Sequence, residues 1–152
     1  GGAGRVAALK LVKEGVAELH LVNRTETKAV DLANEIRDRF PSTAVSVGYP
    51  DNASGNVDLV LNATSLGLKE GDSLPIDENQ FNLSHAEAVF DMIYQPAETP
   101  LLAKAEAAGC RTANGLGMLL WQGVKALEIW TGQAAPVEVM RDALSAHIYG
   151  DG

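Results

Sequence analysis

A group of polar and cationic residues follows the first run of strand-forming residues in the chain. Asn23-Arg24-Thr25 comes directly after residues 18–22, and Lys28 follows one helical turn later. A guanidinium binds a phosphate through charge-assisted, often bidentate hydrogen bonds, while a hydroxyl adds a donor and an ammonium adds a second charge. The group therefore predicts a phosphate-binding site. The alternative is an ordinary solvated Arg and Lys at the start of a helix.

The glycine-rich start of the chain gives this group its context. Gly1-Gly2-Ala3-Gly4-Arg5 runs straight into apolar residues, which is typical of a phosphate-binding turn that opens a helix. Alone, the glycines are as consistent with a frayed chain end. In dinucleotide-binding folds a carboxylate about 20 residues further on accepts from the ribose 2′-hydroxyl. Asn23 and Arg24 stand at that distance, which favours a 2′-phosphate and hence NADP over NAD.

Strand-like and helix-like segments alternate along the whole chain. This alternation predicts an α/β fold with a doubly wound, Rossmann-like parallel sheet. Ligands bind at the carboxyl ends of the strands in such sheets, so the polar turns 23–25, 62–65 and 91–94 should form one site. We expect strands at 18–22, 43–47, 57–61 (a buried-type strand), 88–92 and 110–113, and helices at 3–14, between Thr25 and Pro41, and at 100–108, 115–131 and 136–147.

Composition limits the class of protein. The 152 residues carry a formal net charge of −8, are 46% hydrophobic and include a single cysteine, Cys110. One domain with a substantial core is expected, and the negative charge argues against nucleic acid or an anionic membrane as partner. The lone cysteine indicates a reduced, cytoplasmic setting, and the lack of an apolar run of about 18 residues indicates a soluble protein.

We interpret His20 as a sheet residue, and Trp121 and Trp130 as packing residues.

Motifs spread over the whole chain share their order and spacing with those of one enzyme family. They are Gly1-Gly2-Ala3-Gly4-Arg5; Val22-Asn23-Arg24-Thr25 with Lys28; Asn62-Ala63-Thr64-Ser65-Leu66-Gly67; Asp91-Met92-Ile93-Tyr94 with Thr99-Pro100-Leu101-Leu102; and Gly115-Leu116-Gly117-Met118-Leu119 followed by Gln122-Gly123 and Trp130-Thr131-Gly132. This set resembles the C-terminal, NADP-binding half of the shikimate dehydrogenase family.

The resemblance implies roles for individual residues. Tyr94 and Gln122 would reach hydroxyls or the carboxylate of the substrate; for Gln122, which interrupts an apolar stretch, a plain polar helix face is the alternative. The implied cofactor-binding residues are Gly2, Ala3 and Gly4 along the diphosphate; Asn23, Arg24, Thr25 and Lys28 at the adenosine ribose and its 2′-phosphate; Thr64, Ser65 and Leu66 beside the cofactor as it crosses the sheet; and Met92 and Gly115 at the nicotinamide end.

The resemblance also implies an activity, the NADPH-dependent reduction of 3-dehydroshikimate to shikimate in aromatic amino acid biosynthesis. The family's catalytic Lys–Asp pair lies in an N-terminal substrate domain that this chain does not contain, so we name no catalytic and no metal-binding residue. Residues 1–152 are assigned to the NADP-binding domain with its C-terminal helices, with a sheet that lacks its first strand, and the fragment alone should be inactive. A sheet without its first strand leaves backbone N–H and C=O groups of the neighbouring strands unpaired. We therefore expect the chain to pair with its missing half, rearrange or self-associate.

Three alternatives stay open from the sequence. The first is a quinate/shikimate dehydrogenase that uses NAD. The second is a non-catalytic NADP-binding module, since the chain holds no acid–base pair. The third is the NADP domain of a glutamyl-tRNA reductase, which shares the fold and part of the glycine turn but does not predict the segments around Gly115 to Gln122 and Trp130 to Gly132.

Overall fold

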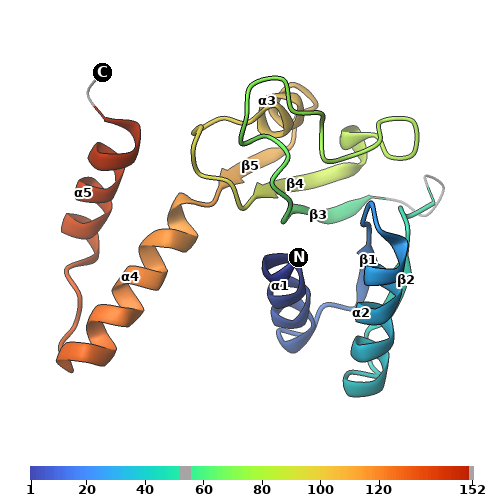
Figure 1. Ribbon diagram of the computed structural model, residues 1–152, viewed down its shortest axis with the longest axis horizontal. Coiled ribbons are helices and arrows are strands. Elements are labelled where there is room, and N and C mark those ends of the chain that lie inside the picture. The colour runs from blue at the N-terminus through green and yellow to red at the C-terminus, as the bar shows by residue number, and fades with distance from the viewer. Residues whose placement is uncertain (52–55, 151–152) are drawn as a thin grey trace.

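The computed structural model describes residues 1–51 and 56–150, so the loop expected at 49–56 lies partly outside the described residues. Strands and helices alternate in the predicted order, and each strand pairing is parallel (Figure 1), which confirms the α/β class. The elements are α1 (Gly2–Lys13), β1 (Glu18–Leu21), α2 (Glu26–Arg39), β2 (Ala44–Val47), β3 (Val57–Asn62), the short 3-10 helix η2 (Leu83–His85), β4 (Ala86–Asp91), α3 (Pro100–Ala107), β5 (Arg111–Asn114), α4 (Leu116–Thr131) and α5 (Val137–Tyr149).

The first structural unit contains β1, β2 and the helices α1 and α2. The two strands run parallel, with Leu19 opposite Val45. The helices pack with the strands around a core of Ala8, Val12 and Ile36. α1 and α2 each present an apolar face to this core, because their apolar residues recur at helical spacing.

The second structural unit contains β3, β4 and β5 in that spatial order. α3 packs against β4 and β5, and Val89, Leu101 and Ala105 belong to the core that forms between helix and sheet. Pro100 opens α3 at a position where its missing N–H costs nothing, and the Thr99 hydroxyl caps the helix by accepting from the Leu102 N–H at 3.3 Å.

The two units do not share one sheet. Among the described residues, β1 pairs with β2 and β3 pairs with β4, and no backbone ladder joins β1 to β3. This break agrees with the expectation of a parallel sheet without its first strand. The buried character predicted for residues 57–61 is wrong, because β3 lies at a sheet edge and Leu59 is 39% exposed.

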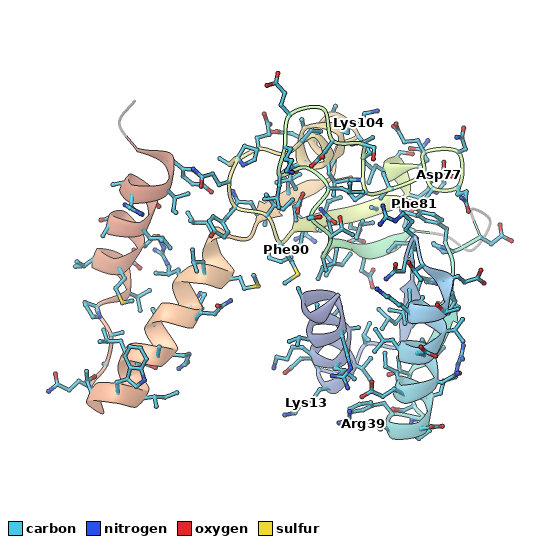
Figure 2. All side chains as sticks on the ribbon, in the orientation of Figure 1. Lys13, Arg39, Asp77, Phe81, Phe90 and Lys104 are labelled. Carbon is cyan, nitrogen blue, oxygen red and sulfur yellow. The ribbon has the colours of Figure 1, made fainter. Side chains whose placement is uncertain are left out.

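Tyr49 links the two units. It follows β2, yet its ring stacks on Phe81 with the centroids 6.3 Å apart, and its hydroxyl oxygen accepts from the Asp77 N–H at 2.7 Å. Asp77 and Phe81 lie on the same side of the second unit (Figure 2). The segment after β2 is therefore anchored in the core of the second unit.

α4 and α5 form a helical hairpin that stands away from both sheets (Figure 1). The two helices pack on each other, but α4 buries only Leu120 and Val124, and α5 buries no residue. Trp121 is 51% exposed and Trp130 82% exposed. The interpretation of both tryptophans as packing residues is therefore wrong for this chain, because half or more of each side chain remains exposed to solvent.

Two further expectations concern metals and membranes. His20 lies in β1, where its Nδ1 is 2.7 Å from Ser46 Oγ, and no group of potential metal ligands occurs among the described residues. None of the described helices is long and apolar enough to cross a membrane.

Candidate functional site

Asn62, the last residue of β3, organises the turn that follows it. Its buried side-chain oxygen accepts from both the N–H (3.0 Å) and the hydroxyl (2.8 Å) of Thr64, and its amide nitrogen donates to the Leu66 carbonyl at 3.3 Å. Thr64 and Ser65 are thereby held on the surface, while Leu66 is half-buried. These are the residues expected to flank the cofactor.

Asp72 holds the far end of the same turn. Its Oδ2 accepts from the backbone N–H groups of Lys69 and Gly67 at 3.0 Å each. These bonds, that from Lys69 foremost, hold the pKa of Asp72 below its ordinary value. Gly67 adopts a φ of 109°, which side chains rarely permit. Hydrogen bonds from Asn62 and Asp72 therefore fix the turn at both ends.

Asp91, the last residue of β4, is fully buried. Its Oδ1 accepts from Asn62 Nδ2 and from the Ile93 N–H, each at 3.0 Å, and its Oδ2 accepts from Thr99 Oγ1 at 2.7 Å. The Met92 N–H donates to the Asn62 carbonyl at 3.0 Å. The turns after β3 and β4 therefore form one hydrogen-bonded structure, as expected from their shared position at the strand ends.

Gly115 lies directly against the segment that follows β4. Its N–H donates to the Ile93 carbonyl at 3.0 Å, and a Cβ on Gly115 would lie 2.1 Å from the Met92 carbonyl oxygen. The structure therefore brings Met92 and Gly115 together. Only a residue without a side chain allows this approach of two backbones.

The glycine-rich start forms the first turn of α1 and not a separate loop. Gly2 and Ala3 are exposed and Gly4 is half-buried; a Cβ on Gly4 would lie 3.6 Å from the Cβ of Ala63. α1 therefore begins beside the turn after β3. Arg5 reaches the other way, to Glu35 of α2, with its Nη2 2.6 Å from Oε1.

The turn after β1 is the most exposed part of the candidate site. Asn23 Oδ1 accepts from the Thr25 N–H at 2.9 Å, and Thr25 occupies the N-cap of α2 without a side-chain capping bond. Arg24 and Lys28 are both exposed. No hydrogen bond between described residues joins this turn to those after β3 and β4, so the structure places it in the first unit.

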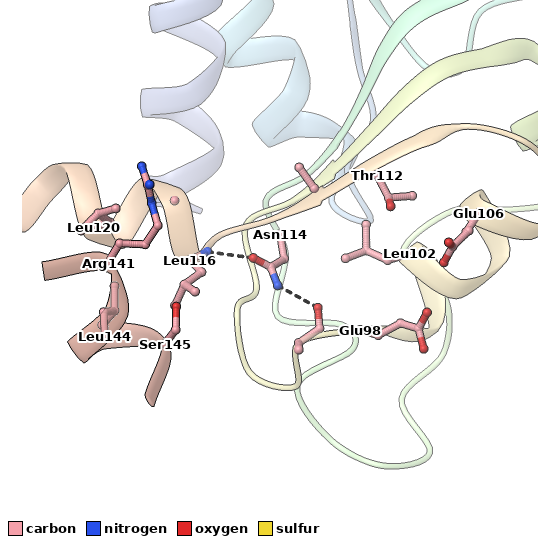
Figure 3. A pocket seen from close by; sticks show the side chains of 13 residues that line it. Glu98, Leu102, Glu106, Thr112, Asn114, Leu116, Leu120, Arg141, Leu144 and Ser145 are labelled. Carbon is pink, nitrogen blue, oxygen red and sulfur yellow. Dashed lines mark hydrogen bonds between the residues drawn. The ribbon is translucent and has the colours of Figure 1, made fainter. Parts of the chain in front are cut away.

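The two residues expected at the substrate come from different elements. Tyr94 is half-buried after β4, and Gln122 is exposed on α4. A groove of about 520 Å³ lies between α3, the end of β5, the start of α4 and α5, and neither Tyr94 nor Gln122 nor any expected cofactor-binding residue lines it (Figure 3). One of its walls is Asn114, whose Oδ1 accepts from the Leu116 N–H at 3.1 Å. The candidate site is therefore the set of strand-end turns and not this groove.

Comparison with known proteins gives the family. Residues 115–144 match the family model of the shikimate 5′-dehydrogenase C-terminal domain. The shikimate dehydrogenase (NADP(+)) of Natronomonas pharaonis is 45% identical over 150 residues, which are 97% of this chain and 53% of that protein. The chain belongs to the shikimate dehydrogenase family.

Solved structures related to the shikimate dehydrogenase family share the fold. A shikimate dehydrogenase in complex with NADP+ matches with a TM-score of 0.80 and 35% identity, over 97% of this chain and 52% of that chain. A quinate dehydrogenase from Corynebacterium glutamicum in complex with NAD matches with a TM-score of 0.80 and 31% identity, over 96% and 52%. This chain spans about half the length of the curated shikimate dehydrogenases that it matches.

The sequence located the shikimate dehydrogenase motifs but not the side chains that join them. The sequence places Asn62 and Asp91 in the strand-end turns but gives them no role of their own, and it leaves Thr99 outside the site, although these three residues connect the two turns. A signal was present, because Asp91 ends an apolar run. A buried carboxylate must find hydrogen-bond donors or a cation, so its position alone predicts a polar network.

Proposed function

We propose that the chain supplies the NADP-binding part of a shikimate dehydrogenase that reduces 3-dehydroshikimate to shikimate in aromatic amino acid biosynthesis. The observation that carries this proposal is the turn after β1, where Arg24 and Lys28 form no ion pair with another described residue. NADP differs from NAD by the phosphate on its adenosine ribose. Arg24 and Lys28 stand where NAD-binding folds carry a carboxylate, and neither forms an ion pair with another described residue. Both features favour binding of the 2′-phosphate of NADP.

The other strand-end residues fit the rest of a dinucleotide. α1 begins at exposed glycines with no side-chain capping bond, so its first N–H groups are available to a diphosphate, and the helix dipole favours an anion there. We assign Gly2, Ala3 and Gly4 to the diphosphate, and Asn23, Arg24, Thr25 and Lys28 to the adenosine ribose and its phosphate. We assign Thr64, Ser65 and Leu66 to the cofactor as it crosses the sheet towards the nicotinamide, and Met92 and Gly115 to the nicotinamide end.

When bound, the nicotinamide would supply the hydride that reduces the C3 ketone of the substrate. In this proposal, the chain itself binds and orients. Tyr94 and Gln122 contact substrate hydroxyls or the carboxylate, since a phenol and an amide both donate and accept hydrogen bonds. A proton must also reach the new hydroxyl, and no lysine among the described residues forms an ion pair with an aspartate. We therefore assign the acid–base pair to the rest of the full-length protein.

We also propose that residues 1–152 are the NADP-binding domain with its C-terminal helices, and that the rest of a cytoplasmic enzyme completes it. The unpaired edges of β1 and β3 leave room in the topology for one parallel strand between the two units. The exposed side of the α4–α5 hairpin offers a surface for the substrate domain. Relatives of about twice this length support the proposal. Pairing with the missing half or self-association stays a prediction.

The test is the substitution Arg24→Ala in the full-length enzyme. Loss of a charge-assisted contact should weaken NADP binding by about 1.5–3 kcal/mol and leave NAD binding nearly unchanged. Lys13→Ala, at the far end of α1 (Figure 2), removes another exposed cation and serves as the control. Calorimetric titration with both cofactors measures the difference; equal losses for NADP and NAD would show that Arg24 does not contact the 2′-phosphate.

A second candidate is a quinate dehydrogenase that uses NAD. It is supported by the match to a quinate dehydrogenase in complex with NAD at a TM-score of 0.80. Steady-state rates of the full-length enzyme with shikimate and quinate, each with NADP and NAD, separate the two. A preference for quinate with NAD would overturn the assignment to shikimate and NADP.

A further inference from the structure

The carboxylate of Asp91 has an unusual environment for a charged group. The side chain is 0% exposed, and it forms no ion pair with a cationic side chain in the described part of the chain. Burying a carboxylate is costly unless hydrogen bonds compensate for the lost water. Asp91 receives three such bonds, and they come from three separate segments.

The first of these segments is the turn after β3. Asn62 Nδ2 donates to Asp91 Oδ1 at 3.0 Å, and the oxygen of the same amide accepts from Thr64. The orientation of the Asn62 amide is therefore fixed by Asp91, because an amide turned around would present its oxygen to the carboxylate. Through Asn62, Asp91 sets the conformation of the turn that carries Thr64, Ser65 and Leu66.

The second segment follows β4 itself. The Ile93 N–H donates to Asp91 Oδ1 at 3.0 Å, and the Ile93 carbonyl accepts from the Gly115 N–H at 3.0 Å. Met92 and Tyr94 flank this residue on either side. Fixing Ile93 therefore fixes Met92 against Gly115 and sets where α4 begins.

The third segment is the start of α3. Thr99 Oγ1 donates to Asp91 Oδ2 at 2.7 Å and accepts from the Leu102 N–H at 3.3 Å. The Thr99 hydroxyl therefore both donates and accepts a hydrogen bond, and the acceptor of its proton is the Asp91 carboxylate. Hydrogen bonds to an ionised acceptor are about twice as strong as neutral ones, so Asp91 holds α3 and both turns in one arrangement.

We propose that Asp91 is a positioning residue for the nicotinamide half of the cofactor site. Its carboxylate holds the turn 62–67, the segment Met92 to Tyr94 and the start of α4 in the arrangement that the nicotinamide requires. Asp91 touches neither the cofactor nor the substrate; it acts through Asn62 and Ile93. The inference depends on the proposed function, because it assigns these turns to the cofactor.

The test uses the full-length enzyme with Asp91→Asn and two ligands, NADP and adenosine 2′,5′-bisphosphate. The bisphosphate carries only the adenosine end, which is assigned to the turn after β1 in the other unit. Asp91→Asn should weaken NADP binding roughly tenfold or more and leave binding of the bisphosphate unchanged. A merely structural role would weaken both ligands equally or neither, and either result would overturn the proposal. Asp77→Asn, which alters a carboxylate that accepts from Asn79 and Gln80, is the matched control and should change neither affinity.

A second pair of variants decides the question if Asp91→Asn does not fold. Thr99→Val keeps the shape but removes the donor to Asp91, and Thr99→Ser keeps the donor. NADP binding should be weakened in the first and restored in the second, and equal affinities in the two would overturn the proposal.

Amide hydrogen exchange separates failure of this inference from failure of the proposed function. If the unaltered enzyme binds neither nucleotide, the proposed function is wrong. Amide exchange at Thr64 and Leu66 then tests, without any ligand, whether Asp91 holds the turn after β3 in place. Faster exchange there in the Asp91→Asn variant, or in Thr99→Val if the former does not fold, supports the positioning role, provided that exchange in β1 and β2 is unaffected. Unchanged exchange at Thr64 and Leu66 overturns it.

Discussion

The β3–β4–β5 sheet and the α4–α5 hairpin are both rich in apolar side chains, but they bury them very differently. In the sheet unit, Leu101 is 1% exposed and Ala105 is fully buried. On the hairpin, Ile129 is 78% exposed and Trp130 is 82% exposed. α3 packs against the sheet, whereas the contacts of α5 are chiefly with α4 (Figure 1).

This difference shows which region has a core of its own. An apolar helix face is stabilised by the surface it removes from water, at about 25 cal/mol per Å², and the hairpin removes little. Extended apolar patches are uncommon on monomeric proteins and mark interaction surfaces. The hairpin therefore agrees with the proposal that the rest of the full-length enzyme covers it, while the sheet unit should depend on its own contacts.

The largest effect is expected in the core of the sheet unit. Leu101→Ala should destabilise the chain by about 2–5 kcal/mol, because it leaves a cavity between α3 and the sheet. Leu68→Ala makes the same change at a residue that is 53% exposed, and it should alter stability by no more than about 0.5 kcal/mol. Urea-induced unfolding measures both, and similar losses for the two variants would contradict the described core.

The next largest effect is expected where the two regions meet. Gly115→Ala would place a Cβ 2.1 Å from the Met92 carbonyl oxygen, so one backbone must move, at a cost of about 1–3 kcal/mol. Gly117→Ala, two residues further on, meets no atom within 4 Å and should be neutral or stabilising by up to about 1 kcal/mol. Unfolding curves for the pair test this contact. A harmless Gly115→Ala would show that α4 does not begin against the segment that follows β4.

The sequence predicts the helices and strands of both regions but not how much of each is buried, and the reason is physical. Element order and the strand-end turns follow from local patterns, such as Pro100 opening a helix and Gly132 ending one with a φ of 67°. The exposure of Trp121 and Trp130 cannot be predicted from the local sequence, because a helix face has the same apolar pattern whether or not another segment covers it.

The candidate site shows the same division between local and tertiary information. The residues around Asn62 and Asp91 could be placed at strand ends from their motifs. Their mutual hydrogen bond joins residues 29 positions apart, and no spacing rule within either turn specifies it. The break between β1 and β3 likewise depends on which strands are present, not on the sequence of either strand.

A smaller, local effect is expected from acid on the turn at the end of β3. Hydrogen bonds from the Lys69 and Gly67 N–H groups lower the pKa of Asp72 below its ordinary 3.8. Because the folded pKa is the lower one, this stabilisation is complete above the unfolded pKa and is lost as the pH falls through the folded pKa. NMR titration should show the Gly67 and Lys69 amides shifting with a midpoint below 3.8. Asp72→Asn should remove this transition, and a midpoint at or above the ordinary value would contradict the bonds.

The smallest effect in this chain is expected on the hairpin. Trp130→Ala should change the free energy of unfolding of residues 1–152 by no more than about 0.5 kcal/mol, because the ring is 82% exposed. In the full-length enzyme the same substitution should cost about 3–5 kcal/mol, the usual loss for a buried tryptophan. Urea unfolding of both proteins gives the two values. A small loss in both would show that the hairpin stays uncovered, whereas a large loss already in the short chain would show that its own residues bury Trp130. Only a loss confined to the full-length enzyme agrees with a hairpin whose apolar face is completed by the rest of the protein.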